Sequence, residues 1–494
     1  MKRLCRRQTN GDMLSLCPMN SFNRRFTSSF ALCTLLISAT PAARADDGNQ
    51  VQVINHGVAA FEKRFQMIEH AQHSIDVEYF IYNTDEAGRL FTQALIQKKL
   101  ESPGVRIRIL VDASPTVLQL KGNFVSEMAE HGLEVKYYNN ISLLQFSKAQ
   151  FRDHRKIVMI DGQEAITGSR NIADEYFDMS KTFNFRDRDI WMQGPVVQDI
   201  QASFDAYWTN QRTTPGETLT SMDQSKQVKL QKAAKTFVQE TKYDRSLRVA
   251  IHNVGSAILA EPDSMGSCNS LTYVGDTAGY QSPETRRVLP ALFRRMNKIP
   301  NGGTLTIESP YFIVRDAEAK KEMARLKKKD IQAVLLTNSL ASTDAYYVAA
   351  NFYPNASFYQ SLSNSKMYIF EGNTPVSTPF LRYKDSGAAL TEKATWGIHS
   401  KTFVFSDESF AIGTFNVDPR SANLNSEMLM FCEGSQSLAK FVLKDIEKRI
   451  TQSDLLGKDG KLPDGHSIFD HVGLGKRLKF KAAMLPSEWF SYLL

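Results

Sequence analysis

One short polar pattern occurs twice in this chain of 494 residues, and it constrains the fold more than any other feature. In each copy a histidine is followed by a lysine two residues later, a glycine 14 residues later and an asparagine 17 residues later. The repeated polar residues are His154, Lys156 and Asn171 in one half and His399, Lys401 and Asn416 in the other. Internal repetition of this kind marks duplication of a structural unit, so we expect two copies of one fold.

The segments around the two motifs follow one another in the same order. In the first half, strand-like runs at 73–88 and 105–112 enclose a helical segment, and the motif comes later. In the second half, runs at 303–319 and 331–339 enclose a lysine-rich helical segment, again with the motif downstream. Strands that alternate with helices predict an α/β fold, here two lobes that each hold a mostly parallel sheet flanked by helices. A polar linker at 213–227 joins the two lobes.

The beginning of the chain has the features of a secretory signal peptide. It contains a basic start at Arg24 and Arg25, a short apolar run at 30–39 and an A-x-A cleavage pattern at 43–45. The apolar run is too short to cross a bilayer, which takes about 20 residues. Cleavage would make Asp46 the first residue and predicts an exported protein of the periplasm or cell envelope, or a secreted one. An uncleaved anchor and a different start codon are the alternatives.

These features divide the chain into a signal peptide at 1–45, a first lobe at 46–225 and a second lobe at 226–494. The second lobe ends in a basic and aromatic tail that contains Lys476, Arg477, Lys479, Lys481, Trp489, Phe490, Tyr492 and Leu493. Basic residues beside aromatic ones suit the surface of an anionic bilayer, so we expect peripheral contact with a membrane. The alternative is that the tail packs against the protein itself.

The net charge of +7 does not by itself indicate a nucleic-acid partner. Seven basic residues and one acidic residue fall within the first 45 residues, so the cleaved chain is close to neutral. Binding to a nucleic-acid backbone requires clustered positive charge. We therefore expect no nucleic-acid partner, and no sequence feature predicts an obligate protein partner.

Cysteine usage leaves the redox state open. Three of the five cysteines lie in the leader, which leaves Cys268 and Cys432. An oxidising compartment would allow a disulfide between them, and two free buried thiols fit the sequence equally well. No group of cysteines and histidines has the spacing of a zinc site, so we expect neither a metal nor another cofactor.

The motif sequence predicts a hairpin in both halves, with an apolar strand, a turn and a second strand. Residues two apart in a strand point to the same face, so the histidine and lysine of each motif project together. Asn171 and Asn416 end the second strands and can return to the same rim.

This set of side chains suits the cleavage of a phosphodiester. The substrate is an anion whose transition state spreads charge over the equatorial oxygens, where two lysines and two asparagines can stabilise it. One neutral histidine can attack phosphorus and form a phosphohistidine, while the other donates a proton to the leaving oxygen. The chemistry requires no metal.

A histidine nucleophile also needs a carboxylate that holds its other ring nitrogen. Asp189 and Glu427 each open an apolar strand after the motif asparagine, and they are the candidates for this role behind the site. His154 is our candidate nucleophile because Asp161 follows its motif, whereas Ser406 stands at the equivalent position of the second copy, although the two roles could be reversed.

With these residues the chain resembles the phospholipase D superfamily, whose members carry H-x-K-x4-D twice. His154, Lys156 and Asp161 fit that pattern fully, and Asp161 would lie behind the site. The second copy has Ser406 at the aspartate position, with Asp407 one residue later. The resemblance implies a duplicated fold with one active site at the lobe interface, and transfer of a phosphatidyl group from a phospholipid to an alcohol or to water.

Within the superfamily the chain is most similar to bacterial cardiolipin synthases without transmembrane helices. The segments that carry this resemblance include GSRNIADEYF, GPVVQDIQASFDAYW and GTFNVDPRSANLNSEM. A secreted nuclease of the same superfamily is the alternative, because it would use the same catalytic groups. A binding protein that kept the fold without activity is disfavoured by the complete set of two histidines, two lysines and two asparagines.

Overall fold

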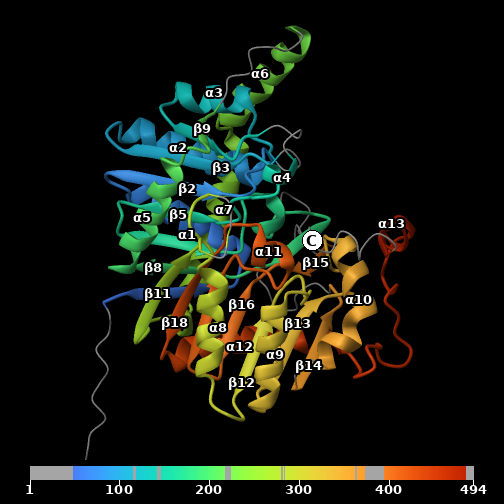
Figure 1. Ribbon diagram of the computed structural model, residues 1–494. Helices are drawn as coiled ribbons and strands as arrows, with labels where there is room; N and C mark the ends of the chain where they lie inside the picture. The colour runs from blue at the N-terminus through green and yellow to red at the C-terminus, as the bar shows by residue number, and fades with distance from the viewer. Residues whose placement is uncertain are drawn as a thin grey trace, which may run out of the picture. The chain divides into compact units, whose positions relative to one another are not determined.

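Two β-sheets, one for each copy of the motif, form the framework of the computed structural model (Figure 1). The structure describes residues 48–114, 118–141, 146–216, 224–279, 282, 284–361, 364–372 and 394–484. All of them belong to one compact unit, Ala45–Leu494. The expected signal peptide and the aromatic end of the tail lie outside the described residues.

The first sheet has nine strands in the order β10-β1-β8-β6-β5-β2-β3-β4-β9. Its strands are β1 (Gln50–Ile54), β2 (Ser74–Tyr79), β3 (Arg106–Asp112), β4 (Glu134–Tyr138), β5 (Ile157–Ile160), β6 (Glu164–Gly168), β8 (Asp189–Gln193), β9 (Thr213–Pro215) and β10 (Met265–Gly266). The helices of this half are α1 (Gly57–His70), α2 (Glu86–Glu101), α3 (Gly122–Glu130), α4 (Phe146–Ala149), α5 (Val196–Trp208), α6 (Gln224–Val238) and α7 (Lys242–Leu259), with short 3-10 turns η2 (Asp174–Tyr176) and η3 (Pro262–Ser264).

The second sheet has eight strands in the order β11-β18-β17-β16-β12-β13-β14-β19. Its strands are β11 (Ser270–Gly275), β12 (Thr304–Glu308), β13 (Gln332–Asn338), β14 (Asn364–Phe370), β16 (Thr402–Phe405), β17 (Ser409–Gly413), β18 (Met428–Glu433) and β19 (Ser453–Leu455). The helices of this half are α8 (Val288–Lys298), α9 (Ala317–Lys328), α10 (Tyr346–Ser361), α11 (Pro419–Asn423), α12 (Gln436–Ile450) and α13 (Leu474–Met484).

The α/β class and the duplication agree with the expectation, but the expected parallel character of the sheets is wrong in part. Only β2-β3-β4 and β12-β13-β14 run parallel, and every other pairing in the two sheets is antiparallel. Helices α2 and α3 make the crossovers between parallel neighbours in the first sheet, and α9 and α10 make them in the second. The hairpins that carry the motifs are antiparallel, because a short turn can join only antiparallel strands.

Both motif hairpins are apolar on two faces because each lies between two cores. In β5, Val158 and Ile160 belong to the core of the first half. Ile157 and Met159 belong to a second core, which also contains Ile412 of β17. Strands that are buried on both sides are expected to be continuously apolar. The motif strands therefore lie at the junction of the two halves.

The first half extends further along the chain than the expected boundary at 225/226. Phe237 of α6 and Leu247 and Ile251 of α7 pack into the core of the first half. The β10 strand pairs with β1. The chain therefore passes to the second sheet between β10 and β11, and the polar linker leads into two helices that still cover the first half.

Cys268 and Cys432 form a disulfide, which settles the open question about these two thiols. The bond lies in the shared core and joins the residues before β11 to β18. Among the described residues, no helix has the length and apolarity needed to cross a membrane.

Candidate active site

The backbone of each H-x-K motif is bound by the other half of the chain. The His154 amide donates a hydrogen bond to the Ser426 carbonyl over 3.0 Å, and the His399 amide donates to the Arg186 carbonyl over 2.9 Å. Two further strands extend the second contact: β15 (Thr395–Ile398) pairs in parallel with β7 (Phe183–Arg186). The two motifs are thereby held at one interface with the same local geometry.

Each motif histidine also receives its carboxylate from the other half. The Nδ1 atom of His154 lies 3.0 Å from Glu427 Oε2, and the Nδ1 atom of His399 lies 3.1 Å from Asp187 Oδ2. Both distances fit donation from Nδ1–H to the carboxylate, which leaves Nε2 with a lone pair for attack or proton transfer. The two histidine–carboxylate pairs thus each span the interface.

Asp189 does not have the expected role. Its Oδ2 atom accepts a hydrogen bond from Arg64 over 2.9 Å, inside the first half. The residue that contacts His399 is Asp187, two positions earlier in the segment FRDRD. Asp187 precedes strand β8 as Glu427 precedes β18, whereas Asp189 is the first residue of β8. The position of an aspartate relative to the first residue of the strand therefore distinguishes Asp187, which contacts a motif histidine, from Asp189, which does not.

Asp161 lies at the far end of strand β5 from His154. It sits in the β5–β6 turn with φ of 55°, and its carboxylate accepts the amides of Gln72, His73 and Ser74. Ser406 occupies the corresponding turn of the second half with φ of 59°. Asp161 therefore fixes the beginning of β2 and does not contact a motif histidine. The second half can lack this carboxylate without a change at the site.

The two motif lysines are buried beside their histidines. Lys156 Nζ donates to the His154 carbonyl over 2.6 Å, and Lys401 Nζ donates to the His399 carbonyl over 2.5 Å. Burial and the neighbouring Lys401 lower the pKa of Lys156 to about 7. Burial lowers the pKa of Lys401 to about 8, against the attraction of Asp187. A bound anion would favour the charged form of both lysines.

Burial lowers the pKa of both histidines, but to different degrees. The pKa of His154 is well below its usual value because of burial and the charges of Lys156 and Lys401. Burial and Lys401 also lower the pKa of His399, but Asp187 opposes that shift. His399 is therefore the histidine that accepts a proton more readily.

The two carboxylates differ more strongly than the histidines. Burial raises the pKa of Glu427 to about 8, although Lys156 opposes the shift. For Asp187, burial is outweighed by His399 and Lys401, so its pKa lies well below the usual range. Environments that separate the pKa values of matched groups are typical of sites that assign one acid and one base.

The repeated asparagine and glycine have distinct roles in the geometry. Asn171 Oδ1 accepts the Ile81 amide over 3.2 Å. Asn416 is buried, and its Oδ1 has no hydrogen-bond partner within the described ranges, so a substrate could bind there. A Cβ atom at Gly168 or Gly413 would collide with the backbone of the neighbouring strand, which explains why glycine recurs at this position.

Residues that the sequence did not predict complete the site. The rings of Phe80 and Tyr176 lie edge-on to His154 and His399, with centroids 5.1 and 5.2 Å away. Ser421 Oγ donates to Glu427 over 2.8 Å. Ser169 Oγ donates to Asp187. No spacing in the sequence singles these residues out, because they come from three separate segments.

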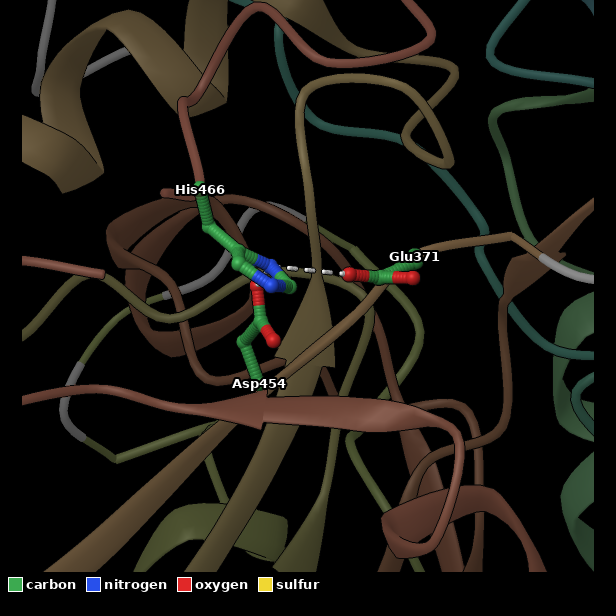
Figure 2. Close-up of side chains that lie close together, drawn as sticks. All are labelled: Glu371, Asp454 and His466. Carbon is green, nitrogen blue, oxygen red and sulfur yellow. Dashed lines mark hydrogen bonds and ion pairs between the residues drawn. The ribbon is translucent and has the colours of Figure 1, made fainter. Parts of the chain in front are cut away.

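One cluster of possible metal ligands lies outside this site (Figure 2). His466 Nδ1 is 2.8 Å from Asp454 Oδ2 and 3.5 Å from Glu371 Oε1. The hydrogen bond that Asp454 accepts from His466 raises the pKa of the imidazole, so the cluster favours an imidazolium between two carboxylates. A metal ligand must be a neutral imidazole, so the cluster is best described as an ion pair that holds the segment after β19.

A family model described as cardiolipin synthase, PLD-like domain, matches residues 65–208 and 299–449. Each matched stretch contains one of the two motifs. The chain is 27% identical over 410 residues to cardiolipin synthase C of Escherichia coli (strain K12). The alignment covers 80% of this chain and 82% of the relative. The chain is also 27% identical over 416 residues to major cardiolipin synthase ClsA of Bacillus subtilis (strain 168), with coverage of 83% and 71%.

In fold, the chain is similar to the crystal structure of phosphatidylserine synthase from Haemophilus influenzae Rd KW20. The TM-score is 0.61 at 13% identity, and the match covers 90% of this chain and 95% of the other. The likeness extends over both halves and agrees with a duplicated phospholipase D-like fold.

Proposed function

The chain belongs to the cardiolipin synthase family of phospholipase D-like proteins, and from this premise we propose that it transfers a phosphatidyl group through a phosphohistidine. The observation that carries the proposal is the pair of histidine–carboxylate contacts across the interface, with both lysines beside them. Acceptors would be an alcohol, as in cardiolipin synthesis, or water, as in hydrolysis.

The first half-reaction breaks the bond between phosphorus and the headgroup oxygen. Nε2 of the neutral histidine attacks phosphorus and forms a P–N bond, while the protonated histidine donates its proton to the departing alcohol. The second half-reaction reverses these roles. The now neutral acid histidine takes the proton of the acceptor hydroxyl, whose oxygen attacks phosphorus and breaks the P–N bond. Lys156 and Lys401 would stabilise the charge on the equatorial oxygens.

The electrostatic asymmetry supports His154 as the nucleophile and His399 as the acid. The nucleophile must start neutral, which suits the strongly lowered pKa of His154. The acid must start protonated, and the ionised Asp187 favours the imidazolium of His399. Binding of the phosphodiester anion would favour that protonated form further.

Helix α13 supports the proposed peripheral contact with a membrane. Leu474 is 74% exposed, Leu478 is 60% exposed and Met484 is 41% exposed. Phe480 packs against Tyr353 of α10, which fixes the helix on the body of the protein. Exposed leucines beside basic residues suit the headgroup region of an anionic bilayer.

The disulfide supports the proposed export. Stable disulfides form in oxidising compartments and are rare in the bacterial cytosol. The Cys268–Cys432 bond therefore favours action in the periplasm or cell envelope, after cleavage of the expected signal peptide. Sequencing the amino terminus of the protein from its native cells would test this part.

The function itself is tested with purified full-length protein and vesicles that contain phosphatidylglycerol and phosphatidylethanolamine. Mass spectrometry should detect cardiolipin or phosphatidic acid with the wild type and neither product with His154→Ala. A parallel incubation with labelled DNA covers the nuclease alternative. Cleavage of DNA with unchanged lipids would overturn the proposal.

A further inference from the structure

A large cavity lies between the two halves, apart from the motif histidines. Its volume is about 710 Å³, within the usual size range of ligand sites. Helix α5 of the first half forms one wall, and β11 with the start of α8 forms the other. The polar groups that line it include Ser203, Tyr273, Thr277, Arg286, Arg287 and Arg294.

Two of the three arginines in this cavity are free to bind an anion. Arg286 donates to the carbonyl of Ala422 and is held in place. Arg287 and Arg294 are exposed, and neither guanidinium forms an ion pair within the part of the chain that the structure describes. Guanidinium groups bind phosphate through paired hydrogen bonds.

The carboxylates of the cavity do not neutralise these arginines. Asp276 uses its Oδ1 to accept the amides of Arg287 and Val288, and its Oδ2 to accept the amide of Glu427. Asp199 lies on the opposite wall, on α5, and forms no ion pair with a described residue. The α8 side of the cavity therefore keeps an excess of positive charge.

We propose that this cavity is a second, regulatory site for a phosphate-bearing ligand, either the headgroup of a lipid or a free phosphate. Arg287 and Arg294 would bind the phosphate, and the hydroxyl of Ser203 lies in the same cavity. The proposal concerns binding and does not depend on which reaction the motif histidines catalyse.

The cavity wall connects directly to the catalytic groups. Asp276 exchanges backbone hydrogen bonds with Glu427, since its amide donates to the Glu427 carbonyl over 2.9 Å and its carboxylate accepts the Glu427 amide over 3.0 Å. Glu427 in turn holds His154. Arg155, between the two motif residues, contacts both walls, since it donates to Ser203 of α5 and to Tyr273 of β11. A ligand that shifts either wall would move His154 relative to its carboxylate.

Binding is tested without turnover in the full-length His154→Ala/His399→Ala protein. Isothermal titration with inorganic phosphate and with dihexanoylphosphatidic acid should show a site that is lost, or weakened at least tenfold, by Arg287→Gln/Arg294→Gln. A control, Arg106→Gln/Lys229→Gln, removes the same charge from residues that do not line the cavity and should retain that site. Unchanged binding in the arginine variant would overturn the proposal. Tighter binding of the lipid identifies a headgroup as the ligand, and equal binding identifies free phosphate.

Regulation is tested with the catalytic histidines intact. The better of the two probes should change the initial rate at least twofold in the wild type and in the charge-matched control. That change should vanish in Arg287→Gln/Arg294→Gln, whereas competition at the catalytic site would persist there. Binding in the cavity without any difference in rate response between these proteins would disprove the regulatory role.

Discussion

At the scale of single residues, two chemically equal motifs differ through their carboxylates. Asp187 is ionised in the range where enzymes work, because His399 and Lys401 outweigh its burial. Glu427 has a pKa raised to about 8 by burial. The same exchange of partners across the interface therefore gives His399 an ionised carboxylate that opposes the lowering of its pKa, whereas the pKa of His154 lies well below its usual value.

This asymmetry predicts unequal effects of the two histidine substitutions. With a phospholipid donor, His154→Ala and His399→Ala should each lower kcat by at least about a hundredfold, because a general acid or base alone contributes about 10²–10⁴-fold. A p-nitrophenyl phosphodiester has a leaving group that needs little protonation. With this substrate, His399→Ala should show a substantial part of the wild-type rate in the initial burst, whereas His154→Ala should not. Mapping of the phosphorylated peptide provides the control. Label on the peptide that contains His399 would contradict the assignment.

The raised pKa of Glu427 predicts a pH-dependent stability that Asp187 lacks. A carboxyl whose pKa is higher in the folded state keeps its proton there longer, so the protein loses stability as the pH rises towards the folded pKa. Relative to Glu427→Gln, the wild type should lose about 1 kcal/mol of unfolding free energy between pH 7 and 8 and then level off.

Chemical denaturation from pH 7 to 9 measures this difference. Asp187→Asn is the matched control, because a carboxyl with a lowered pKa is fully ionised in both states above pH 7. The difference in unfolding free energy between the wild type and Asp187→Asn should therefore stay constant over this range. If the difference in unfolding free energy between the wild type and Glu427→Gln is also constant, Glu427 is ionised in the folded protein.

At the scale of elements, the motif hairpins and helix α13 differ in how their apolar residues are covered. The β5 strand is apolar on both faces because cores from both halves cover it. Helix α13 buries Phe480 and leaves Leu474 and Leu478 exposed. Exposed leucines four residues apart lie on one face of a helix, so they form a continuous apolar strip.

That strip predicts a specific effect on membrane binding. Leu474→Glu/Leu478→Glu should reduce cosedimentation with phosphatidylglycerol vesicles at least fivefold, because it removes apolar contact and adds repulsion from the anionic surface. Val228→Glu/Val249→Glu is a matched control, since these valines are 64% and 60% exposed on α6 and α7. Equal losses in both variants would indicate that charge alone matters and that α13 is not the contact.

At the scale of the whole molecule, the disulfide fixes strands β11 and β18 in the core that both halves share. Glu427 immediately precedes β18, so this strand also positions a catalytic carboxylate. Cys268 and Cys432 are 164 residues apart in the chain, so the cross-link restricts a large part of the unfolded state.

Removal of the disulfide should therefore lower stability without loss of the fold. Cys268→Ser/Cys432→Ser should decrease the unfolding free energy by about 2–5 kcal/mol. Calorimetry of the double variant, and of the wild type with and without reductant, measures the effect. A Tm that neither reductant nor the double substitution changes would show that the thiols are free in solution.

The sequence by itself determined the duplication and the chemical groups of the site. His154, Lys156, His399 and Lys401 could be named because strand periodicity and equal spacing are local properties of the chain. The α/β class followed for the same reason, from the alternation of strand-like and helical runs.

Only the tertiary structure decided how the two halves share their residues. The contacts of His154 with Glu427 and of His399 with Asp187 join residues 273 and 212 positions apart. The choice of Asp187 over Asp189, the late crossing to the second sheet and the Cys268–Cys432 bond depend on similar long-range contacts. Periodicity reports which face of an element is buried, but it carries no information about which distant segment covers that face.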